Sequence, residues 1–418
     1  MQITLIAFGS RGDVTPIVAL GHQLRAEGHG VRLASHAEFA SLASTHGLQF
    51  TALGGSYQDF LATPEGRAAL GIPRNSPLGC LGVFTPFQDN AVEVFQRCWQ
   101  ATEAADALVC SGVAMPVGTH IATRRNLPIA FGLVVPGVAT RNFVHPSMPP
   151  WPLGRFYKRA SYHLALQLIT YGGRKVFEAW TSAANRLGGA ARYPLRAIAL
   201  VPVSPVLLPR PTDWPAAVHV TGFWFLPSEA GTNPPAELDA FVNAGAPPLA
   251  IGFGSMPEDQ PEELRMIVRD TLEKLDMRAV VVGGSGGALG DFTASERVLQ
   301  VPFANYDWLF PRTSVIVHQG GVGTAAFALR AGLPQVAVPY CLDHAFWASQ
   351  LRNIGVAGAA IRRHRLSARA LTAAIQQVLR DPRFGEAARR ARAAVCAEQR
   401  GVEIAARLVT QHFEAARH

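Results

Sequence analysis

The sequence predicts an α/β protein of two domains, each built on a parallel sheet. Short apolar runs recur along the 418 residues, and several are followed by a glycine-containing or serine-containing turn and then by helix formers. This pattern starts twice, at the FGSRGD turn of residues 8–13 and again at the FGSMPE turn of residues 253–258. Between the two starts, prolines recur from residue 200 to residue 233 and interrupt regular structure. A chain of this length is also typical of two or three domains.

The first half opens as a βαβ unit. Residues 3–8 form an apolar strand and residues 16–27 a helix, which the glycines of the GHG segment close before a second strand at residues 31–35. In such a doubly wound sheet the ligand crevice lies at the carboxyl ends of the strands. The elements expected next are a strand at 107–112, a helix at 116–125, a strand at 128–136, a long loop at 138–153 and a helix at 156–187.

The second half repeats the alternation. A strand and turn at residues 247–256 precede a helix at residues 261–275. Two β-branched runs then predict buried strands. The remaining elements expected here are strands at 277–284 and 297–301 and a last helix at 401–413.

Composition indicates a compact enzyme without a membrane span. The chain is 49% hydrophobic and 16% charged, and no unbroken apolar run reaches the roughly 20 residues that cross a bilayer. The first residues have the pattern of a strand, not that of a cleaved signal peptide. The five cysteines have neither paired nor metal-ligand spacing, so we expect reduced thiols. These features predict a cytoplasmic protein that needs no metal.

The net charge of +8 raises the question of an acidic partner. Much of the excess is arginine in the C-terminal helical segments, and no nucleic-acid motif or aromatic interleaving accompanies it. A solvated arginine-rich helix face is therefore favoured over a nucleic-acid site. Weak, peripheral attraction to the inner face of a membrane stays open.

The most informative stretch covers residues 315–350 and reads as strand, glycine-rich turn, helix, strand and polar loop. A β-branched run ends at His318, the GGVG segment allows a tight turn, and TAAFALRA is rich in helix formers. A helix that starts after a strand and a glycine turn offers free N–H groups and the positive end of its dipole to an anion. A diphosphate would fit this position. Taken alone, the glycines would equally suit an ordinary turn between a strand and a helix.

The combination of motifs in this stretch resembles the nucleotide-sugar signature of two-domain (GT-B) glycosyltransferases, in the branch of sterol, glycolipid and antibiotic-aglycone enzymes. The shared features are HQGGVGT, the GLP turn, the VP strand end, and the Asp343-His344 pair followed by an aromatic residue. In that family the histidine and the glycine turn hold the donor diphosphate, and the acidic residue holds sugar hydroxyls. The resemblance assigns the donor diphosphate to Ser255, His318, Gly320, Gly321, Val322, Gly323 and Thr324, the donor sugar to Asp343 and His344, and the nucleotide base to Val301 and Pro302.

The resemblance also implies two facing Rossmann-like domains with a cleft between them. We expect an acceptor-binding domain at residues 1–212, a linker at 213–235, a nucleotide-sugar-binding domain at 236–400 and a C-terminal helix at 401–418 that crosses back to the first domain.

Two departures from the family pattern bear on the donor. Relatives often carry Asp-Gln where this chain has Asp343-His344, so the second sugar contact is altered, although histidine also donates or accepts a hydrogen bond. Many UDP-sugar members have a glutamate for the ribose where this chain has Ala326. The sequence is therefore compatible with either a UDP-linked or a dTDP-linked sugar as the donor. No cluster has metal-ligand spacing, so the charge of the leaving group would be met by His318 and helix N–H groups.

The sequence allows two roles for Asp13, a helix cap or a general base. Asp13 lies in the first turn after a strand, where aspartate commonly caps the following helix. The GSRGDVTP turn also resembles the GSxGDxxP turn of the same branch, in which the aspartate occupies the position of the general base. A carboxylate within reach of an acceptor hydroxyl can take its proton as the oxygen attacks. With the signature stretch present, we favour the base.

These observations predict an inverting O-glycosyltransferase that uses a nucleoside-diphosphate sugar and a lipophilic, hydroxylated acceptor. Two alternatives stay open: a non-hydrolysing sugar-nucleotide epimerase of the same fold, and a catalytically silent partner of a glycosyltransferase. Retention of both Asp13 and His318 argues against the silent partner. The residues leave open the acceptor, the sugar, the oligomeric state and the need for an auxiliary protein.

Overall fold

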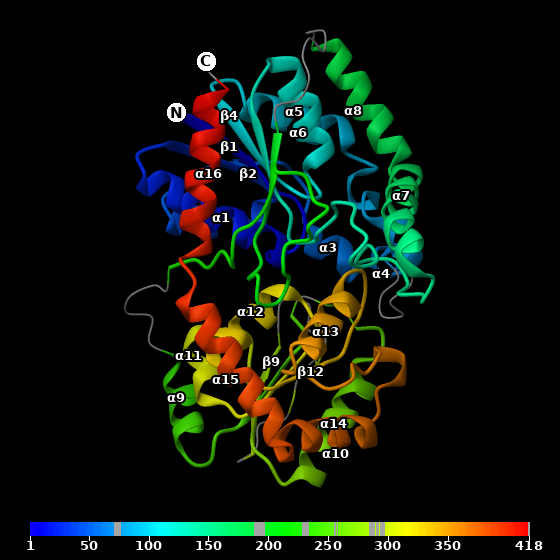
Figure 1. The fold of residues 1–418 in the computed structure, drawn as a ribbon, viewed down its shortest axis with the longest axis vertical. Helices are drawn as coiled ribbons and strands as arrows, with labels where there is room; N and C mark the ends of the chain where they lie inside the picture. Colours follow the sequence, from blue (N-terminus) through cyan, green and yellow to red (C-terminus); the bar gives the residue numbers. More distant parts are fainter. Residues whose placement is uncertain are drawn as a thin grey trace. The chain divides into compact units, whose positions relative to one another are not determined.

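The chain folds into two compact α/β units, each with its own parallel sheet (Figure 1). The computed structural model describes residues 1–70, 77–187, 197–227, 234–254, 256, 258–283, 289, 292 and 297–416. Unit 1 comprises residues 1–60, 80–227 and 398–418, and unit 2 comprises residues 61–79 and 228–397. The prediction of two parallel-sheet α/β domains is confirmed.

The sheet of unit 1 has the order β3-β2-β1-β4-β5-β6-β7, and all its strand pairs are parallel. Its central strand, β1, pairs Leu5 with Leu33 on one side and with Val109 on the other. Because the strand order reverses between β1 and β4, their carboxyl ends border the crevice of a doubly wound sheet. The strands are β1 (Gln2–Ile6), β2 (Gly30–Ser35), β3 (Gln49–Ala52), β4 (Ala107–Ser111), β5 (Ile129–Gly132), β6 (Ala197–Val201) and β7 (Val218–Val220).

Helices cover both faces of this sheet, as the nearly continuous apolar strands require. On one face β1, α1 and the last helix, α16, bury a shared core that includes Leu5, Val18 and Phe413. On the other face α5, α6 and α8 pack around Phe8, Phe95 and Trp180. The helices are α1 (Arg11–Ala26), α2 (Ala40–Thr45), α5 (Ala91–Ala101), α6 (Met115–Arg125), α7 (Gly154–Gly172), α8 (Arg174–Arg186) and α16 (Gly401–Ala415), with short 3-10 turns η1 (Ala37–Phe39), η2 (Pro77–Gly82) and η3 (Thr85–Phe87).

The start of α16 is fixed by a close backbone approach. A Cβ at Gly401 would lie 2.4 Å from the carbonyl carbon of Gly222, so only glycine fits there without movement of the backbone. Glu398, just before the helix, accepts a hydrogen bond from the Ser204 hydroxyl. These contacts hold the C-terminal helix against unit 1.

The sheet of unit 2 has the order β10-β9-β8-β11-β12 and is also parallel. The strands are β8 (Leu249–Gly252), β9 (Ala279–Val282), β10 (Val298–Val301), β11 (Ile316–His318) and β12 (Gln335–Ala337). The helices are α4 (Pro64–Ala69), α9 (Ala236–Asn243), α10 (Pro261–Leu275), α11 (Tyr306–Leu309), α12 (Val322–Ala331), α13 (His344–Asn353), α14 (Ala368–Arg380) and α15 (Pro382–Ala397), with 3-10 turns η4 (Phe310–Arg312) and η5 (Arg363–Arg365). The strand order reverses between β8 and β11, which places the residues after His318 at the crevice edge.

Several elements differ from the sequence-based expectation. The helix expected at residues 156–187 is two helices, because the glycine pair Gly172-Gly173 separates α7 from α8. A Cβ at Gly172 would lie 2.0 Å from the carbonyl oxygen of Leu81. Helix α1 begins at Arg11 rather than at Pro16, so Asp13 lies in its first turn. The proline-rich stretch carries the three-residue strand β7.

The segment 61–79 belongs to unit 2, although the sequence places it within the first half. One division falls inside α3 (Tyr57–Ala62) and the other inside η2 (Pro77–Gly82). None of the helices within the described ranges is both long and apolar enough to cross a membrane.

Candidate functional site

The turn between β11 and α12 exposes the start of a helix. Gly321 is the N-cap of α12, no side chain caps the helix, and its first turn contains no acidic residue. The N–H groups and the positive dipole end are therefore not neutralised by a side chain. Gly320 has φ +88°, and a Cβ there would lie 2.9 Å from the carbonyl oxygen of His344. A Cβ at the exposed Gly323 would meet no atom within 4 Å, so an anion has access to this backbone.

His318 is fully buried below this turn. Its Nδ1 accepts a hydrogen bond of 3.1 Å from the N–H of Gly320, so the neutral ring carries its proton on Nε2. Nε2 has no well-aligned partner within the described part of the chain. Burial lowers the pKa of His318 to about 4, and the nearby Gln335 amide opposes this effect. Among the described residues, neither amide atom of Gln335 has a well-aligned hydrogen-bond partner. The ring is therefore a neutral N–H donor near neutral pH, and the exposed part of the site is the turn itself.

The Asp343-His344 pair lies beside the glycine turn. A Cβ at Gly321 would lie 3.8 Å from Nε2 of His344, so the predicted sugar-binding and diphosphate-binding residues are neighbours. Asp343 accepts a 2.6 Å hydrogen bond from Nε1 of Trp347, one turn along α13. Burial raises the pKa of Asp343 to about 6, and the Trp347 hydrogen bond opposes this rise. Burial lowers the pKa of His344 to about 4.

The residue before this pair has an uncommon backbone conformation. Leu342 has φ +47°, a region that non-glycine residues rarely occupy and that is frequent at functional sites. Such a conformation persists only where the surroundings hold it.

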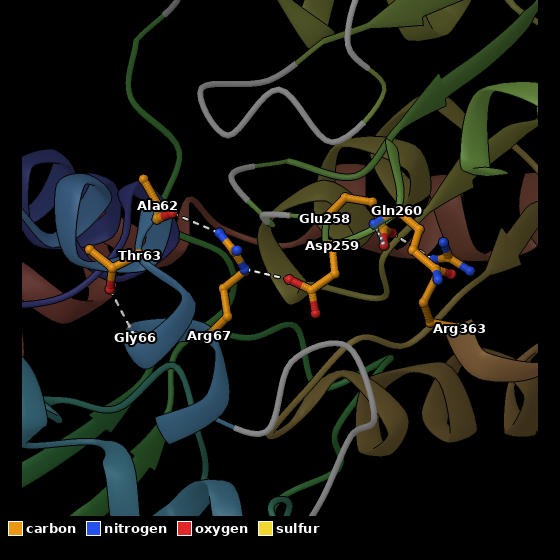
Figure 2. Close-up of polar contacts among 8 residues, drawn as sticks. All are labelled: Ala62, Thr63, Gly66, Arg67, Glu258, Asp259, Gln260 and Arg363. Carbon is orange, nitrogen blue, oxygen red and sulfur yellow. Dashed lines mark hydrogen bonds and ion pairs between the residues drawn. The ribbon is translucent and has the colours of Figure 1, made fainter. Parts of the chain in front are cut away.

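A buried polar network holds the neighbouring segments together (Figure 2). Nε of Arg363 lies 2.6 Å from Oε2 of Glu258, with side chains only 5% and 1% exposed. The Tyr340 hydroxyl donates to the same oxygen at 3.1 Å. Burial raises the pKa of Tyr340, and the negative charge of Glu258 raises it further. The network connects the loop after β8 to the segment just before Leu342 and so fixes two loops that border the turn.

A second ion pair attaches α4 to the same loop of unit 2. Figure 2 shows Arg67 reaching Asp259, the neighbour of Glu258, with 2.5 Å between Nε and Oδ1. Arg67 also donates a 2.7 Å hydrogen bond to the carbonyl of Ala62. Thr63 caps α4 by accepting from the N–H of Gly66 at 3.0 Å. Helix α4 is thus tied to the loop after β8.

Sequence reasoning missed both ion pairs. Each joins residues more than 100 positions apart, as Glu258 and Arg363 are, and neither spacing nor periodicity reveals such a partnership. The only signal was a pair of acidic residues in a predicted turn.

Asp13 is held by the turn that precedes α1. Its Oδ2 accepts hydrogen bonds from both the backbone N–H and the hydroxyl of Ser10, each 2.9 Å long. The first of these is the reciprocal half of a capping box. Gly9, with φ +110°, makes room for this carboxylate, since a Cβ there would lie 2.5 Å from Oδ2. Asp13 is half-buried and stands at the carboxyl end of β1. It therefore serves as a cap and also lies at the crevice edge of its sheet.

The remaining predicted residues are distributed as follows. Val301 is buried at the end of β10, and Pro302 is exposed directly after it. The carbonyl of Val301 accepts a 2.9 Å bond from the N–H of Gly283, so the ends of β9 and β10 are joined at this edge. Ser255 lies outside the described residues. Within the described ranges, no group of His, Cys, Asp and Glu side chains has the arrangement of a metal site.

Comparisons with known proteins indicate the family and the fold of this chain. Residues 3–122 match the N-terminal domain of glycosyltransferase family 28, and residues 267–411 match the C-terminal domain of erythromycin biosynthesis protein CIII-like proteins. The chain is 34% identical to O-mycaminosyltylonolide 6-deoxyallosyltransferase of Streptomyces fradiae, over 99% of this chain and 98% of that protein. It is 31% identical to a sterol 3-beta-glucosyltransferase of Arabidopsis thaliana, over 91% of this chain and 61% of that longer protein.

Solved structures show the same fold. The glycosyltransferase of kitacinnamycin superposes with a TM-score of 0.72 at 20% identity and covers 99% of both chains. SsfS6 of Streptomyces sp. SF2575, solved with thymidine diphosphate, superposes with a TM-score of 0.65 at 20% identity, over 98% of this chain and 99% of that one. The protein is therefore a glycosyltransferase of the GT-B fold and belongs to the family that contains the antibiotic and sterol glycosyltransferases.

Proposed function

We propose that the protein is an inverting O-glycosyltransferase, which moves a sugar from a UDP- or dTDP-linked donor to a hydroxyl of a lipophilic natural product or sterol. The observation that carries the proposal is the uncapped start of α12 beside the Asp343-His344 pair. The relatives support the acceptor class, because one is named for O-mycaminosyltylonolide and another for sterols. Thymidine diphosphate in the SsfS6 structure supports the donor class.

In this proposal unit 2 holds the donor. The backbone from Gly320 to Thr324 receives the diphosphate, and the Nε2–H of His318 adds a neutral donor. Ser255 adds a hydroxyl, and the segment Val301-Pro302 lines the base. Asp343 and His344 bind the sugar hydroxyls. As the bond to the anomeric carbon breaks, charge develops on the diphosphate, and these fixed dipoles stabilise it without a metal or other cofactor.

Unit 1 supplies the base and the acceptor site. The Asp13 carboxylate takes the proton of the acceptor hydroxyl, the acceptor oxygen forms a bond to the anomeric carbon, and the nucleoside diphosphate leaves with the electron pair of the broken bond. Attack from the face opposite the leaving group inverts the configuration. The two hydrogen bonds from Ser10 stabilise the charged form of Asp13 and fix its orientation.

The long loop before α7 is proposed to cover the acceptor. It is anchored at its start, where Asp213 accepts hydrogen bonds of 2.6 Å from the Thr140 hydroxyl and 2.8 Å from the N–H of Arg141. These two hydrogen bonds lower the pKa of Asp213, and the bond from Thr140 has the larger effect. Such long binding loops on a fixed scaffold commonly choose the ligand.

The relatives do not favour the epimerase or the silent partner, because those described above are glycosyltransferases. The direct test is to incubate the protein with UDP- and dTDP-sugars, with and without macrolide aglycones or sterols, and to follow both nucleotide release and product mass. Acceptor-dependent release with a mass gain of one sugar is the expected result. Interconversion of the donor sugar without an acceptor would identify an epimerase instead.

A further inference from the structure

Gln319 is a buried polar residue inside the glycine turn and is not among the residues that the sequence assigned to the donor. It follows His318 directly, and its side chain belongs to a residue that is only 8% exposed. Its Oε1 atom is buried and has no well-aligned hydrogen-bond partner among the described residues. Buried polar atoms of folded proteins nearly always have a partner, and an unpaired one is costly. A ligand that donates a hydrogen bond here would remove this cost.

Two glycines make room for the Gln319 amide. A Cβ at Gly254 would lie 2.6 Å from its Nε2, and a Cβ at Gly321 would lie 3.0 Å from the same atom. Gly254 belongs to the turn after β8 and has φ +62°, and Gly321 is the N-cap of α12. The amide therefore lies against the backbone of both turns, next to the uncapped helix start.

The imidazole of His344 approaches the same glycine. Its Nε2 would lie 3.8 Å from the Cβ at Gly321, so two polar side chains lie near one side of this residue. Nδ1 of His344 is also buried and also lacks a well-aligned partner within the part of the chain that the structure describes. Two buried side chains with unpaired polar atoms beside an open helix start indicate a ligand that carries several hydrogen-bonding groups.

The chemistry of the unpaired oxygen limits what this ligand group can be. A carbonyl oxygen only accepts hydrogen bonds, so its partner must be a donor. The oxygens of an ionised diphosphate carry no proton and cannot donate, whereas every sugar hydroxyl can. The last torsion of a glutamine side chain has a broad energy profile, so a small rotation turns Oε1 toward a hydroxyl that arrives beside Gly321.

We propose that Gln319 is a further donor-binding residue and that its Oε1 accepts a hydrogen bond from a hydroxyl of the transferred sugar. The proposal rests on the function proposed above and adds a contact to the sugar, not to the diphosphate. The transferred sugar is favoured over the ribose because Gln319 and His344 approach the same glycine, and His344 is proposed to bind that sugar. Gln319 therefore selects donors that carry a hydroxyl at one particular position.

The test is titration calorimetry of the full-length protein with UDP, UDP-glucose, dTDP and dTDP-glucose. Gln319→Met keeps the length of the side chain and replaces the amide oxygen by a much weaker acceptor. It should weaken binding of the two glucose nucleotides about 3- to 10-fold, the usual effect of one neutral hydrogen bond. Binding of UDP and dTDP should change less than about twofold. Because the oxygen is unpaired without a ligand, the melting temperature should not fall.

UDP-glucose analogues that each lack one hydroxyl identify the partner of Oε1. For the unmodified protein, the analogue without the bonded hydroxyl should bind more weakly than UDP-glucose, and in Gln319→Met this penalty should disappear. Gln377→Met in α14 is the matched control. Gln377 is another glutamine of unit 2 that packs against a glycine, since a Cβ at Gly358 would lie 2.9 Å from its Oε1. This variant should bind all four ligands like the unmodified protein.

Three results would overturn the proposal and leave the proposed function standing. Gln319→Met could weaken nucleotides and glucose nucleotides equally, it could leave all four affinities unchanged, or its effect could be additive with that of every deoxy analogue. A loss confined to UDP and UDP-glucose would assign the oxygen to the ribose hydroxyl that dTDP lacks, and would equally contradict a contact with the transferred sugar. Failure of the unmodified protein to bind any of the four ligands would contradict the proposed function itself.

Discussion

His318 makes one observed contact and one proposed contact, and two substitutions separate them. Its Nδ1 accepts from the N–H of Gly320, and its Nε2–H is proposed to donate to the donor diphosphate. The amide of asparagine reaches about as far as Nδ1, so His318→Asn keeps an acceptor for Gly320 but loses the Nε2–H. The longer His318→Gln places an N–H near the position of Nε2 but removes the acceptor for the turn.

The size of each effect follows from burial. A hydrogen bond to a charged group contributes about 1.5–3 kcal/mol, so His318→Asn should weaken UDP or dTDP binding roughly 10- to 150-fold. A buried N–H left without an acceptor costs about 1–3 kcal/mol, so His318→Gln should lower the melting temperature and weaken nucleotide binding less than tenfold. Because burial lowers the pKa of His318 to about 4, the ring should remain the same neutral donor between about pH 6 and pH 8.

The assay is titration calorimetry with UDP and dTDP, combined with melting curves on the same samples. His145→Asn is the matched control. His145 is also a buried histidine whose Nδ1 accepts from a backbone N–H, that of Ser147 at 3.2 Å, but it belongs to unit 1. Its substitution should leave nucleotide affinity unchanged. Nucleotide binding by His318→Asn within about threefold of the unmodified protein would refute the assignment of Nε2 to the diphosphate.

Two further predictions concern the sugar-binding pair and the buried network. The pKa of Asp343 is raised to about 6, and its ionised form accepts hydrogen bonds from sugar hydroxyls. The KM for the nucleotide sugar should therefore rise as the pH falls below about 6. Asp343→Asn should abolish this pH dependence, and a steep dependence in that variant would contradict the assignment. Arg363→Met leaves the Glu258 carboxylate buried and unpaired, which should cost about 3–5 kcal/mol in the free energy of unfolding measured with urea. The double variant with Glu258→Gln should recover part of that loss, and a purely additive double variant would show that the two side chains do not act as a pair.

The elements with local signals could be predicted from the sequence. Helix α10 spans residues 261–275 as expected, because a proline starts it and Asp276, in the left-handed conformation, ends it. The turn after β11 could be predicted because its glycines follow a β-branched run. The end of α7 was missed although Gly172 and Gly173 are a local signal for a break. The contact that admits only glycine at position 172 is with the backbone of Leu81, about ninety residues earlier.

Contacts between residues far apart in the sequence could likewise not be predicted from local patterns. The burial of Arg363 follows from Glu258, which lies 105 residues away. The placement of segment 61–79 in unit 2 accompanies the contact of Arg67 with Asp259. For the candidate site, the residue types came from the resemblance. The structure added that His318 is fully buried and that Asp13 is already engaged with Ser10.

The engagement of Asp13 with Ser10 sharpens the question of its role. Asp13→Asn retains an oxygen that can accept the N–H of Ser10, but its amide cannot take a proton from an acceptor hydroxyl. Ser367→Ala is the matched control for a pure cap, since the Ser367 hydroxyl accepts from the N–H of Ala370 at 3.2 Å at the start of α14. That variant should lose about 1 kcal/mol of stability with unchanged turnover.

The most direct test of the account is the turnover and melting temperature of Asp13→Asn, measured on one preparation with a productive donor and acceptor. The account predicts that turnover falls by about 10²–10⁴-fold, the usual effect of losing a positioned base, while melting temperature and nucleotide affinity stay close to those of the unmodified protein. A lower melting temperature with nearly unchanged turnover per folded molecule would show that Asp13 is only a cap and would contradict the proposed mechanism.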